Sequence, residues 1–483
     1  MQGPTGDSAQ LDELDGVGQA ELVRRGEVSA RELVEAAARR IERLNPGVNA
    51  VIAPLVDEAL AAVSSSNLSR TPFMGLPLLL KDIGATQAGL PQYSGSRALL
   101  ARRHRSPADT ELGARFRRAG FVVAGLTNTS EFGSQPTTQP LAFGPTRNPW
   151  DPARSVAGSS GGAAAAVATG MVPIAHGSDI AGSIRMPSSW CGTVGLKPSR
   201  GRVPVGPLIA RDLVEHVLTR TVRDTAAVLD AVHGAEPGAL HIAPPPARTY
   251  AEEVGADPGS LRIGLRSSVD ASGVVVHPDC AAAVEAAGRA LEALGHAVEP
   301  GGPAALFDDA FVANWTGITA ARLNRLLETV GAALGHAATA DDVEPYQLAF
   351  AARGEIPARA LLALEEWQQP YAARVASWWA RGHDLLVTPT TGEPPALLDE
   401  LVPPPEDPLA ILPRFLQIQC FAIPFSVTGQ PAISLPLHRT ASGLPVGVQL
   451  VAPHGAEDVL LRVAAQLEVA HPWGGARPPA PGG

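Results

Sequence analysis

Hydrophobic and polar residues follow two different periods along this 483-residue chain. Residues 29–44 have apolar side chains three and four positions apart behind a capping box of Ser29 and Glu32, which predicts an amphipathic helix. Similar patterns predict helices over 56–64, 109–119, 223–232, 279–294, 307–329, 358–379 and 457–470. Short apolar runs between turn residues predict strands over 49–55, 71–82, 121–125, 261–265, 384–389 and within 432–451. The chain therefore mixes helices and strands along its whole length.

Residues 156–204 contain two serines in glycine-containing turns. The first turn reads Gly-Ser-Ser-Gly-Gly at 158–162, and the second reads Ala-Gly-Ser-Ile-Arg at 181–185. Tight turns of this kind leave backbone N–H groups free to point at a negative oxygen, and a serine can be the nucleophile of acyl transfer. Either turn alone is more typical of a flexible loop. The prediction of a catalytic site therefore depends on the two turns together, with Lys81 and Asp82 upstream.

Two residues of this region have a second interpretation. Lys81 ends the apolar run 71–82, and a lysine in that position is usually a surface group whose stem packs on apolar side chains. Ser160 is the centre of a Gly-x-Ser-x-Gly sequence, which is typical of the nucleophile elbow in α/β-hydrolases. The elbow needs a buried strand directly before it, whereas residues 147–156 are expected to form a coil broken by prolines. We therefore expect Ser160 to support the site by hydrogen bonding.

The whole stretch resembles the motif of the amidase signature enzymes. The matching segments are 158–162, 179–187 and 195–204, and the two serines of the family, Ser159 and Ser183, stand 24 residues apart. Further similarity lies at 75–82, 127–133, 425–436 and 443–451. Residues 173–179 resemble the subgroup that includes the cyclic nylon-dimer amide hydrolases. The resemblance implies an α/β protein with the amidase signature fold, in which helices cover both faces of a central mixed β-sheet in a single large domain.

The resemblance also implies a Ser-cisSer-Lys triad. In such a triad Ser183 attacks the carbonyl carbon, Ser159 follows a cis peptide bond and passes the proton, and Lys81 is the base. Lys81 must then be neutral, so burial and nearby donors must lower its pKa from the usual value of about 10.4.

Further site residues follow from the same resemblance. The oxyanion hole is expected to consist of the backbone amides of Ile180, Ala181, Gly182 and Ser183. Position 181 is Ala where most family members have Gly, and we expect a negative φ there. Hydrogen bonds that support the turns are expected from Ser160, Asp179 and Arg185. Contacts with the substrate are expected from Gln135, Trp315 and Phe421.

The expected organisation is a single domain with short tails. We predict an N-terminal tail over 1–16 and an amidase signature domain over 17–472, with the core motif at 156–204 and a variable region that covers the substrate at about 235–420. Residues 473–483 are rich in Pro and Gly and are predicted to be a disordered tail.

Composition excludes several other classes of function. The formal net charge of −10 and the absence of Lys/Arg blocks argue against nucleic acid or an anionic membrane as a partner. Three cysteines are too few for a disulfide framework, and we interpret Cys191 as a small buried hydrophobe. The twelve histidines are scattered, so neither a zinc site nor a His-based triad is predicted, and His176 is expected to be structural. No signal peptide or membrane-spanning run is recognisable, which predicts a cytoplasmic protein.

The resemblance to the amidase signature enzymes implies an amidase without a cofactor. We expect it to cleave a neutral, apolar or aryl, linear small-molecule amide through an acyl-enzyme on Ser183. A carbamate (urethane) or ester hydrolase with the same triad is an alternative, as are the glutaminase subunit of a tRNA-dependent amidotransferase and an inactive binding protein on the same fold. Lys81, Ser159 and Ser183 together argue against the binding protein, and the lack of a recognisable partner surface argues against the amidotransferase subunit. A homodimer is common in the family.

Overall fold

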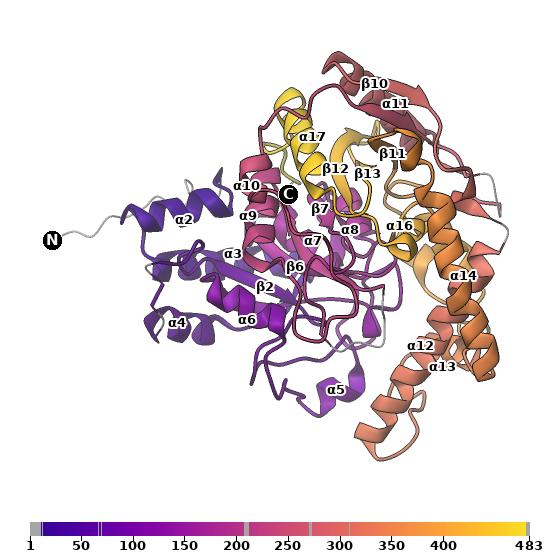
Figure 1. The fold of residues 1–483 in the computed structure, drawn as a ribbon. Helices are drawn as coiled ribbons and strands as arrows, with labels where there is room; N and C mark the ends of the chain where they lie inside the picture. Colours follow the sequence, from indigo (N-terminus) through magenta and orange to yellow (C-terminus); the bar gives the residue numbers. More distant parts are fainter. Residues whose placement is uncertain are drawn as a thin grey trace.

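The computed structural model of the protein describes residues 11, 13–65, 67–68, 70–206, 212–269, 273–308 and 310–479. Within these residues the chain forms a large α/β domain around a mixed sheet, as predicted (Figure 1). The sheet has eleven strands. In spatial order they are β1 (Val51–Pro54), β3 (Val122–Thr127), β2 (Pro77–Lys81), β6 (Ile174–Asp179), β8 (Val214–Thr219), β7 (Val194–Lys197), β12 (Ala432–Arg439), β13 (Pro445–Val451), β11 (Leu385–Pro389), β9 (Arg262–Leu265) and β10 (Ala297–Pro300).

Parallel and antiparallel pairs are both present in the sheet. Strand β2 runs parallel to β3 and β6, and β9 runs parallel to β10 and β11. The pairs between them, from β6 through β8, β7, β12 and β13 to β11, are antiparallel. The register of β6 and β8 places Ser178 directly opposite Glu215. This pair of strands lies beside β2, whose last residue is Lys81.

Helices cover both faces of the sheet. In β2, Leu78 and Leu80 join one core cluster, on the face covered by the helices over 111–118, 222–232, 278–293 and 457–470, whereas Leu79 joins a second cluster with the helices over 56–65 and 161–168. This alternation follows the period of two of a strand buried on both faces. The helices of these layers are α2 (Gly16–Arg24), α3 (Ala30–Val48), α4 (Val56–Ser65), α6 (Glu111–Arg118), α7 (Gly161–Ala168), α8 (Arg185–Cys191), α9 (Val222–Val232), α10 (Tyr250–Glu253), α11 (Pro278–Ala293) and α17 (Glu457–Ala470).

Helix α7 is built only from Gly, Ala and Val, and every one of its residues is buried. A Cβ on Gly162 would lie 2.5 Å from the backbone nitrogen of Asn128, so the helix packs too closely for a larger residue at that position. The small side chains therefore allow the segment after Ser159 to lie deep in the molecule.

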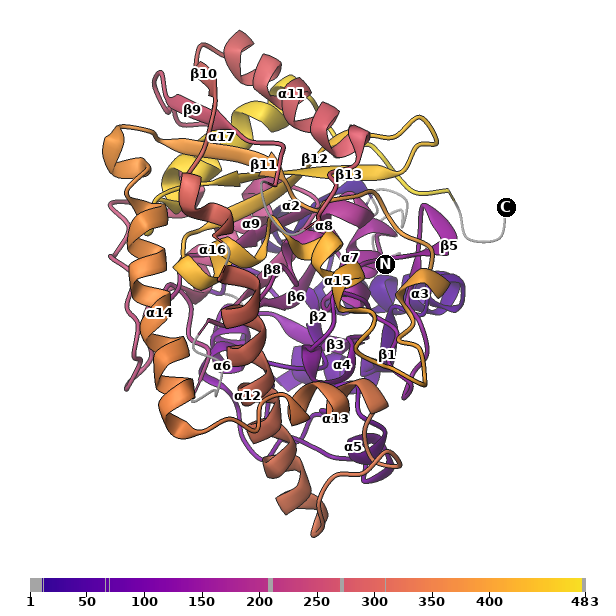
Figure 2. The same ribbon diagram turned by 90° about the vertical axis from the view of Figure 1, so that its right-hand side faces the viewer.

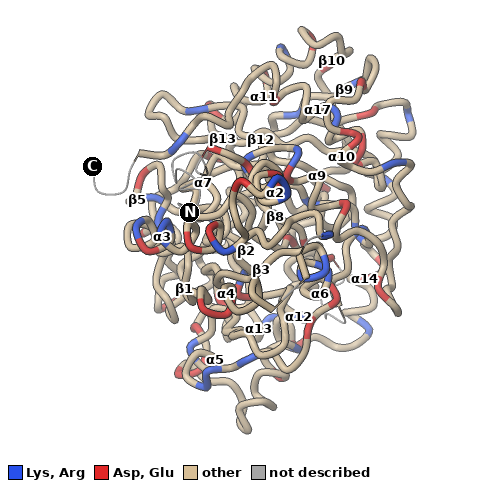
Figure 3. The backbone as a smooth tube through the Cα atoms, turned by 90° about the vertical axis from the view of Figure 1, so that its left-hand side faces the viewer, with Lys and Arg blue, Asp and Glu red and all other residues tan. Residues whose placement is uncertain are grey.

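A second group of helices stands at one side of the sheet (Figure 2). Trp315, Tyr371, Trp378 and Trp379 share one apolar cluster there. The helices of this side are α5 (Arg97–Ala101), α12 (Phe311–Leu334), α13 (Pro345–Ala352), α14 (Ala358–Ala376), α15 (Leu412–Gln419) and α16 (Ile423–Thr428). On the opposite side of the molecule, basic and acidic residues are intermixed (Figure 3).

Several predicted boundaries need correction. The run 71–82 is a strand only over Pro77–Lys81, because Pro72 and the positive φ angles of Met74 and Gly75 interrupt its first half. The first amphipathic helix continues to Val48, where Asn49 ends it with a φ of 53°. The expected coil at 147–156 contains a small antiparallel pair, β4 (Arg147–Asn148) and β5 (Asp151–Ser155), and β5 is largely exposed. Ser160 therefore does not follow a buried strand of the main sheet.

Parts of both predicted tails belong to the folded domain. Leu11 lies in the core, and Asp15 caps α2 and forms an ion pair with Arg223. At the other end Trp473 is buried, and its indole N–H donates to the carbonyl oxygen of Arg220 over 3.0 Å. The rest of the predicted tails, 1–10, 12 and 480–483, lies outside the described residues.

Candidate active site

Lys81 occupies the end of β2 and is 1% exposed. Its Nζ donates hydrogen bonds to Ser159 Oγ over 2.7 Å and to Ser178 Oγ over 2.9 Å. Burial lowers the pKa of Lys81 to about 7, although the carboxylates of Glu215 and Asp179 act in the opposite direction. A substantial fraction of the amine is therefore neutral near pH 7, and it is in contact with a serine hydroxyl.

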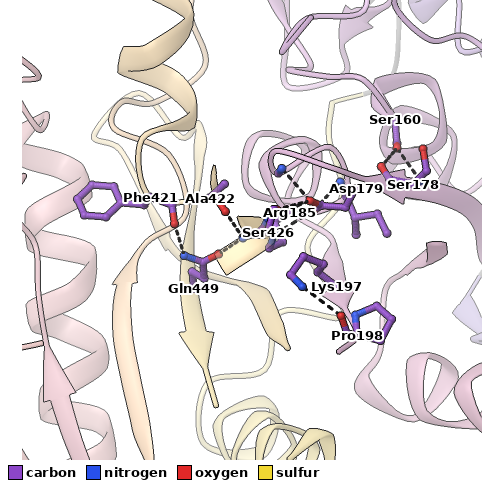
Figure 4. Close-up of polar contacts among 12 residues, drawn as sticks. Ser160, Ser178, Asp179, Arg185, Lys197, Pro198, Phe421, Ala422, Ser426 and Gln449 are labelled. Atoms are coloured by element: carbon purple, nitrogen blue, oxygen red, sulfur yellow. Dashed lines mark hydrogen bonds and ion pairs between the residues drawn. The ribbon is translucent and has the colours of Figure 1, made fainter. Parts of the chain in front are cut away.

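The two serine turns meet at Ser160. The backbone N–H of Ser160 donates to the carbonyl oxygen of Ser183 over 3.2 Å. Its hydroxyl donates to the carbonyl oxygen of Ser178 over 3.2 Å, as Figure 4 shows. The peptide bond between Gly158 and Ser159 is cis. A Cβ on Gly158 would lie 2.2 Å from the carbonyl oxygen of Thr137, so only glycine fits there. These contacts hold the Ser159 turn against the Ser183 turn.

The turn that presents Ser183 lies between β6 and α8 and is shaped by Asp179. The Asp179 carboxylate accepts hydrogen bonds from the N–H of Gly182 over 2.8 Å and from the N–H of Ile184 over 3.2 Å. Because the Gly182 N–H already has this acceptor, it is not available for an oxyanion, and the prediction for Gly182 needs correction. Among the described residues, no hydrogen bond uses the N–H groups of the other three predicted donors, Ile180, Ala181 and Ser183.

Backbone conformation in this turn agrees with the expectation for Ala181. Gly182 has a φ of 114°, a region that L-residues rarely adopt, whereas Ala181 is not among the described non-glycine residues with positive φ. A Cβ on Gly182 would also lie 2.5 Å from the Cβ of Ala422. The one position of the turn that requires glycine is therefore occupied by glycine.

Arg185 links this turn to the C-terminal part of the sheet (Figure 4). Its guanidinium forms a bidentate ion pair with Asp179 over 2.8 and 2.9 Å, and its other donors reach Ser426, Gln449 and the carbonyl oxygen of Ala422. Burial acts to raise the pKa of Asp179, but the charge and hydrogen bonds of Arg185, the charge of Lys197 and the N–H of Gly182 together outweigh it, and the pKa falls to about 2. The turn thus rests on a buried, permanently charged pair.

A cavity of about 810 Å³ opens beside these groups. Ser159, Ser178 and Ser183 line it, as do two of the residues predicted to contact substrate, Gln135 and Trp315. Most of its remaining wall is apolar and comes from Ile83, Phe132, Ile180, Met186, Leu213, Phe311, Leu323, Leu326, Tyr346, Phe350, Phe415, Leu416 and Ile423. The cavity has the size and character of a site for a small, mainly apolar molecule.

The position of Phe421 does not support the predicted contact with substrate. Its side chain is fully buried, packs edge-on against Phe307 and is not among the residues that line the cavity. Gln419 and Ile423, its neighbours in the chain, form the wall at this point.

Sequence reasoning missed two polar residues of the site. Ser178 accepts a hydrogen bond from Lys81, and Glu215 is 2% exposed and lines the cavity. Both occupy buried strands, β6 and β8, that the apolar pattern did not predict. Two features of the sequence could have indicated them. Ser178 stands next to Asp179 of the motif, and Glu215 is an isolated acidic residue in the apolar run 213–218.

Other candidate chemistries find no support in the described part of the chain. Cys191 is buried, and burial raises the pKa of its thiol, so it is an inert core residue. No group of three or more His, Cys, Asp or Glu within the described ranges could hold a metal ion. Among the same residues, every helix is too short or too polar to cross a membrane.

Comparison with known proteins identifies the family to which the chain belongs. The family model described as Amidase matches residues 32–461, so the chain belongs to the amidase family. Together with the fold, this match defines an amidase signature hydrolase that acts on amide bonds.

Comparison with individual relatives shows which subgroup of the family the chain resembles. The chain is 43% identical over 476 residues to the 6-aminohexanoate-cyclic-dimer hydrolase of Paenarthrobacter ureafaciens, with 96% of each chain covered. A solved structure of 6-aminohexanoate cyclic dimer hydrolase complexed with substrate superimposes with a TM-score of 0.93 at 42% identity, over 97% of this chain and 99% of that chain. A bacterial aryl acylamidase of the amidase signature family superimposes with a TM-score of 0.86 at 26% identity, over 96% and 97% of the two chains. The resemblance to the nylon-dimer subgroup is therefore confirmed.

Proposed function

We propose that this enzyme hydrolyses a small-molecule amide, with uncharged groups next to the scissile bond, through an acyl-enzyme on Ser183. The observation that carries the proposal is the buried Lys81 amine, which donates to the Ser159 hydroxyl at the cavity that Ser183 also lines. A neutral Lys81 can accept the proton of Ser159, and Ser159 can accept the proton of Ser183. This transfer supplies a serine oxygen able to attack a carbonyl carbon.

The attack converts the carbonyl oxygen to an oxyanion. The N–H groups of Ile180, Ala181 and Ser183 are the donors we assign to it, since the Gly182 N–H donates to Asp179. When the tetrahedral intermediate collapses, the C–N bond breaks and the departing nitrogen takes the proton back from Lys81 through Ser159. Water then attacks the ester carbonyl carbon of the acyl-enzyme while Lys81 and Ser159 remove its proton. As the C–O bond to Ser183 breaks, this proton returns through Ser159 to the Ser183 oxygen, and the acid product is released.

The cavity supports an apolar substrate. Its wall consists mainly of Leu, Ile, Phe and Met side chains, which favour alkyl or aryl groups on either side of the scissile bond. The similarity to hydrolases of 6-aminohexanoate cyclic dimer extends the proposed substrates from linear to cyclic amides.

Mass spectrometry of the intact protein after a single turnover tests the proposal. The panel comprises 6-aminohexanoate cyclic dimer, acyl p-nitroanilides and an aryl carbamate, with Ser183→Ala and Ser160→Ala measured beside the native chain. We expect an acyl adduct that maps to Ser183, is absent in Ser183→Ala and persists in Ser160→Ala. An adduct on Ser160, or turnover that survives Ser183→Ala, would contradict the assigned roles, and turnover of the carbamate alone would contradict the substrate class.

A further inference from the structure

We propose that Glu215 is a recognition site for a second nitrogen on the substrate, an ammonium or an amide N–H that is not part of the scissile bond. The proposal rests on the proposed amide hydrolysis and concerns the specificity of that same cavity. Glu215 is 2% exposed, lines the cavity and stands opposite Ser178 in the register of β6 and β8. Its carboxylate is therefore placed next to the catalytic groups.

One oxygen of this carboxylate has no partner in the protein. Among the described residues, no hydrogen bond or ion pair reaches Glu215 Oε1, although the atom is buried. A buried carboxylate oxygen without a donor is costly, and native structures rarely leave one unpaired. A donor supplied by a ligand in the cavity would remove this cost.

The other oxygen faces His176. Nδ1 of His176 accepts the backbone N–H of Lys81 over 3.3 Å, so in the neutral imidazole the proton resides on Nε2. Nε2 lies 3.6 Å from Glu215 Oε2, which directs the N–H toward the carboxylate. The imidazole therefore lies beside Oε2 without a hydrogen bond to it, and Oε1 receives no donor from the described protein.

The catalytic lysine does not occupy the free oxygen. The hydrogen bonds of Lys81 Nζ go to Ser159 and Ser178, and no ion pair joins Lys81 to Glu215 among the described residues. Oε1 packs directly against Gly84, because a Cβ at that position would lie 2.0 Å from it. Gly84 and Glu215 both line the cavity, so the unpartnered carboxylate belongs to its wall.

The charged residues that line the cavity support a positive or N–H-bearing group beside Glu215. Glu215 is the one acidic residue among those that line the cavity in the described chain, and the basic ones are Arg322 and Arg353. Arg322 is already paired with Asp212 over 2.6 Å. A hydrogen bond to a charged acceptor in such a site typically changes affinity by about tenfold to a hundredfold.

Calorimetric titration of the full-length Ser183→Ala protein tests the proposal without requiring turnover. The probes are two series of increasing chain length, ω-aminoalkanamides and N-(ω-aminoalkyl)acetamides, each compared with the analogue that ends in methyl. The pH is kept well below about 10, where an alkyl amine stays protonated. We expect one series to show an aminated ligand that binds at least about tenfold more tightly than its methyl analogue.

Variants at Glu215 test whether its carboxylate causes the tighter binding of the aminated ligands. Glu215→Gln in the same background should abolish it, whereas Glu285→Gln, the same charge change at an exposed position of α11, should retain it. Glu215→Asp, which keeps the charge on a shorter side chain, should reduce it and serves if Glu215→Gln does not fold. The proposal is overturned if neither series shows a preference, if Glu215→Gln retains it, or if Glu215→Asp equals the parent. Because binding is measured without acylation, failure of the proposed hydrolysis would appear separately, in the mass spectra.

Discussion

Replacement of Arg185 by Met should damage both the stability and the activity of the enzyme. All five N–H groups of the guanidinium donate within the protein, two to Asp179 and the others to Ser426, Gln449 and Ala422. Arg185 is 0% exposed, so water cannot replace these contacts. The substitution would leave the Asp179 carboxylate buried without its counter-charge.

The expected magnitude follows from that uncompensated charge. Removing one partner of a buried ion pair costs about 3–5 kcal/mol. For a chain of 483 residues, an unfolding entropy of about 2.1 cal/mol/K per residue gives roughly 1 kcal/mol/K, so the melting temperature should fall by about 3–5 °C. Since Asp179 also shapes the turn through Gly182 and Ile184, acylation should slow by about 10²–10³, the range seen when an oxyanion donor is lost.

Differential scanning calorimetry and single-turnover acylation measure the two effects. Arg185→Lys is the matched control, because it keeps the charge but has three donors in place of five, and it should cost less stability. The double variant Asp179→Asn with Arg185→Met should recover part of the lost stability, since it removes both charges. A decrease under about 1 °C in Arg185→Met, or additive losses in the double variant, would refute the view that the turn depends on this pair.

Three further outcomes test the site. The acylation rate should rise with pH through about 7, because protonated Lys81 cannot accept the serine proton. The Glu215 carboxylate raises the pKa of Lys81, so Glu215→Gln should shift this rise to lower pH. An unshifted profile would contradict this electrostatic link between Glu215 and Lys81. Gly182→Ala should destabilise the fold by at least about 1 kcal/mol and slow acylation, because the φ of Gly182 is 114° and the new methyl group would meet Ala422. An unchanged midpoint of urea unfolding would count against the described turn. Ser178→Ala should reduce kcat about fivefold by removing one of the two hydroxyls that hold Lys81, and an effect on KM alone would assign Ser178 to substrate binding.

The sequence pattern predicted the strands on either side of the sheet better than those at its centre, although it missed the edge strand β10. The helix over 457–470 was predicted with both its boundaries, because its apolar side chains follow one face and its ends are marked. Strands β6 and β8 were not predicted, although every residue in both is buried. Their sequences, IAHGSD and VEHVLT, contain His, Ser, Asp and Glu where the pattern of a buried strand requires apolar side chains.

The catalytic residues were accessible to sequence reasoning because they lie in a motif with fixed spacing, whereas their supporting residues depend on strand pairing. Ser159 and Ser183 stand 24 residues apart in glycine-containing turns that can be recognised in the chain. Ser178 meets Glu215 only through the antiparallel register of β6 and β8, which no local pattern specifies.

Polar residues inside a wholly buried strand carry their own information, however. Each one costs free energy unless it has a partner or a ligand, so a strand that keeps several of them is under a constraint other than packing. In β6 and β8 most of these groups have visible partners: Ser178 binds Lys81, and Asp179 binds Arg185. Among the described residues, Glu215 Oε1, His176 Nε2 and both ring nitrogens of His216 have none. Of these three residues only Glu215 lines the cavity, which is the physical reason to look for its partner in the substrate.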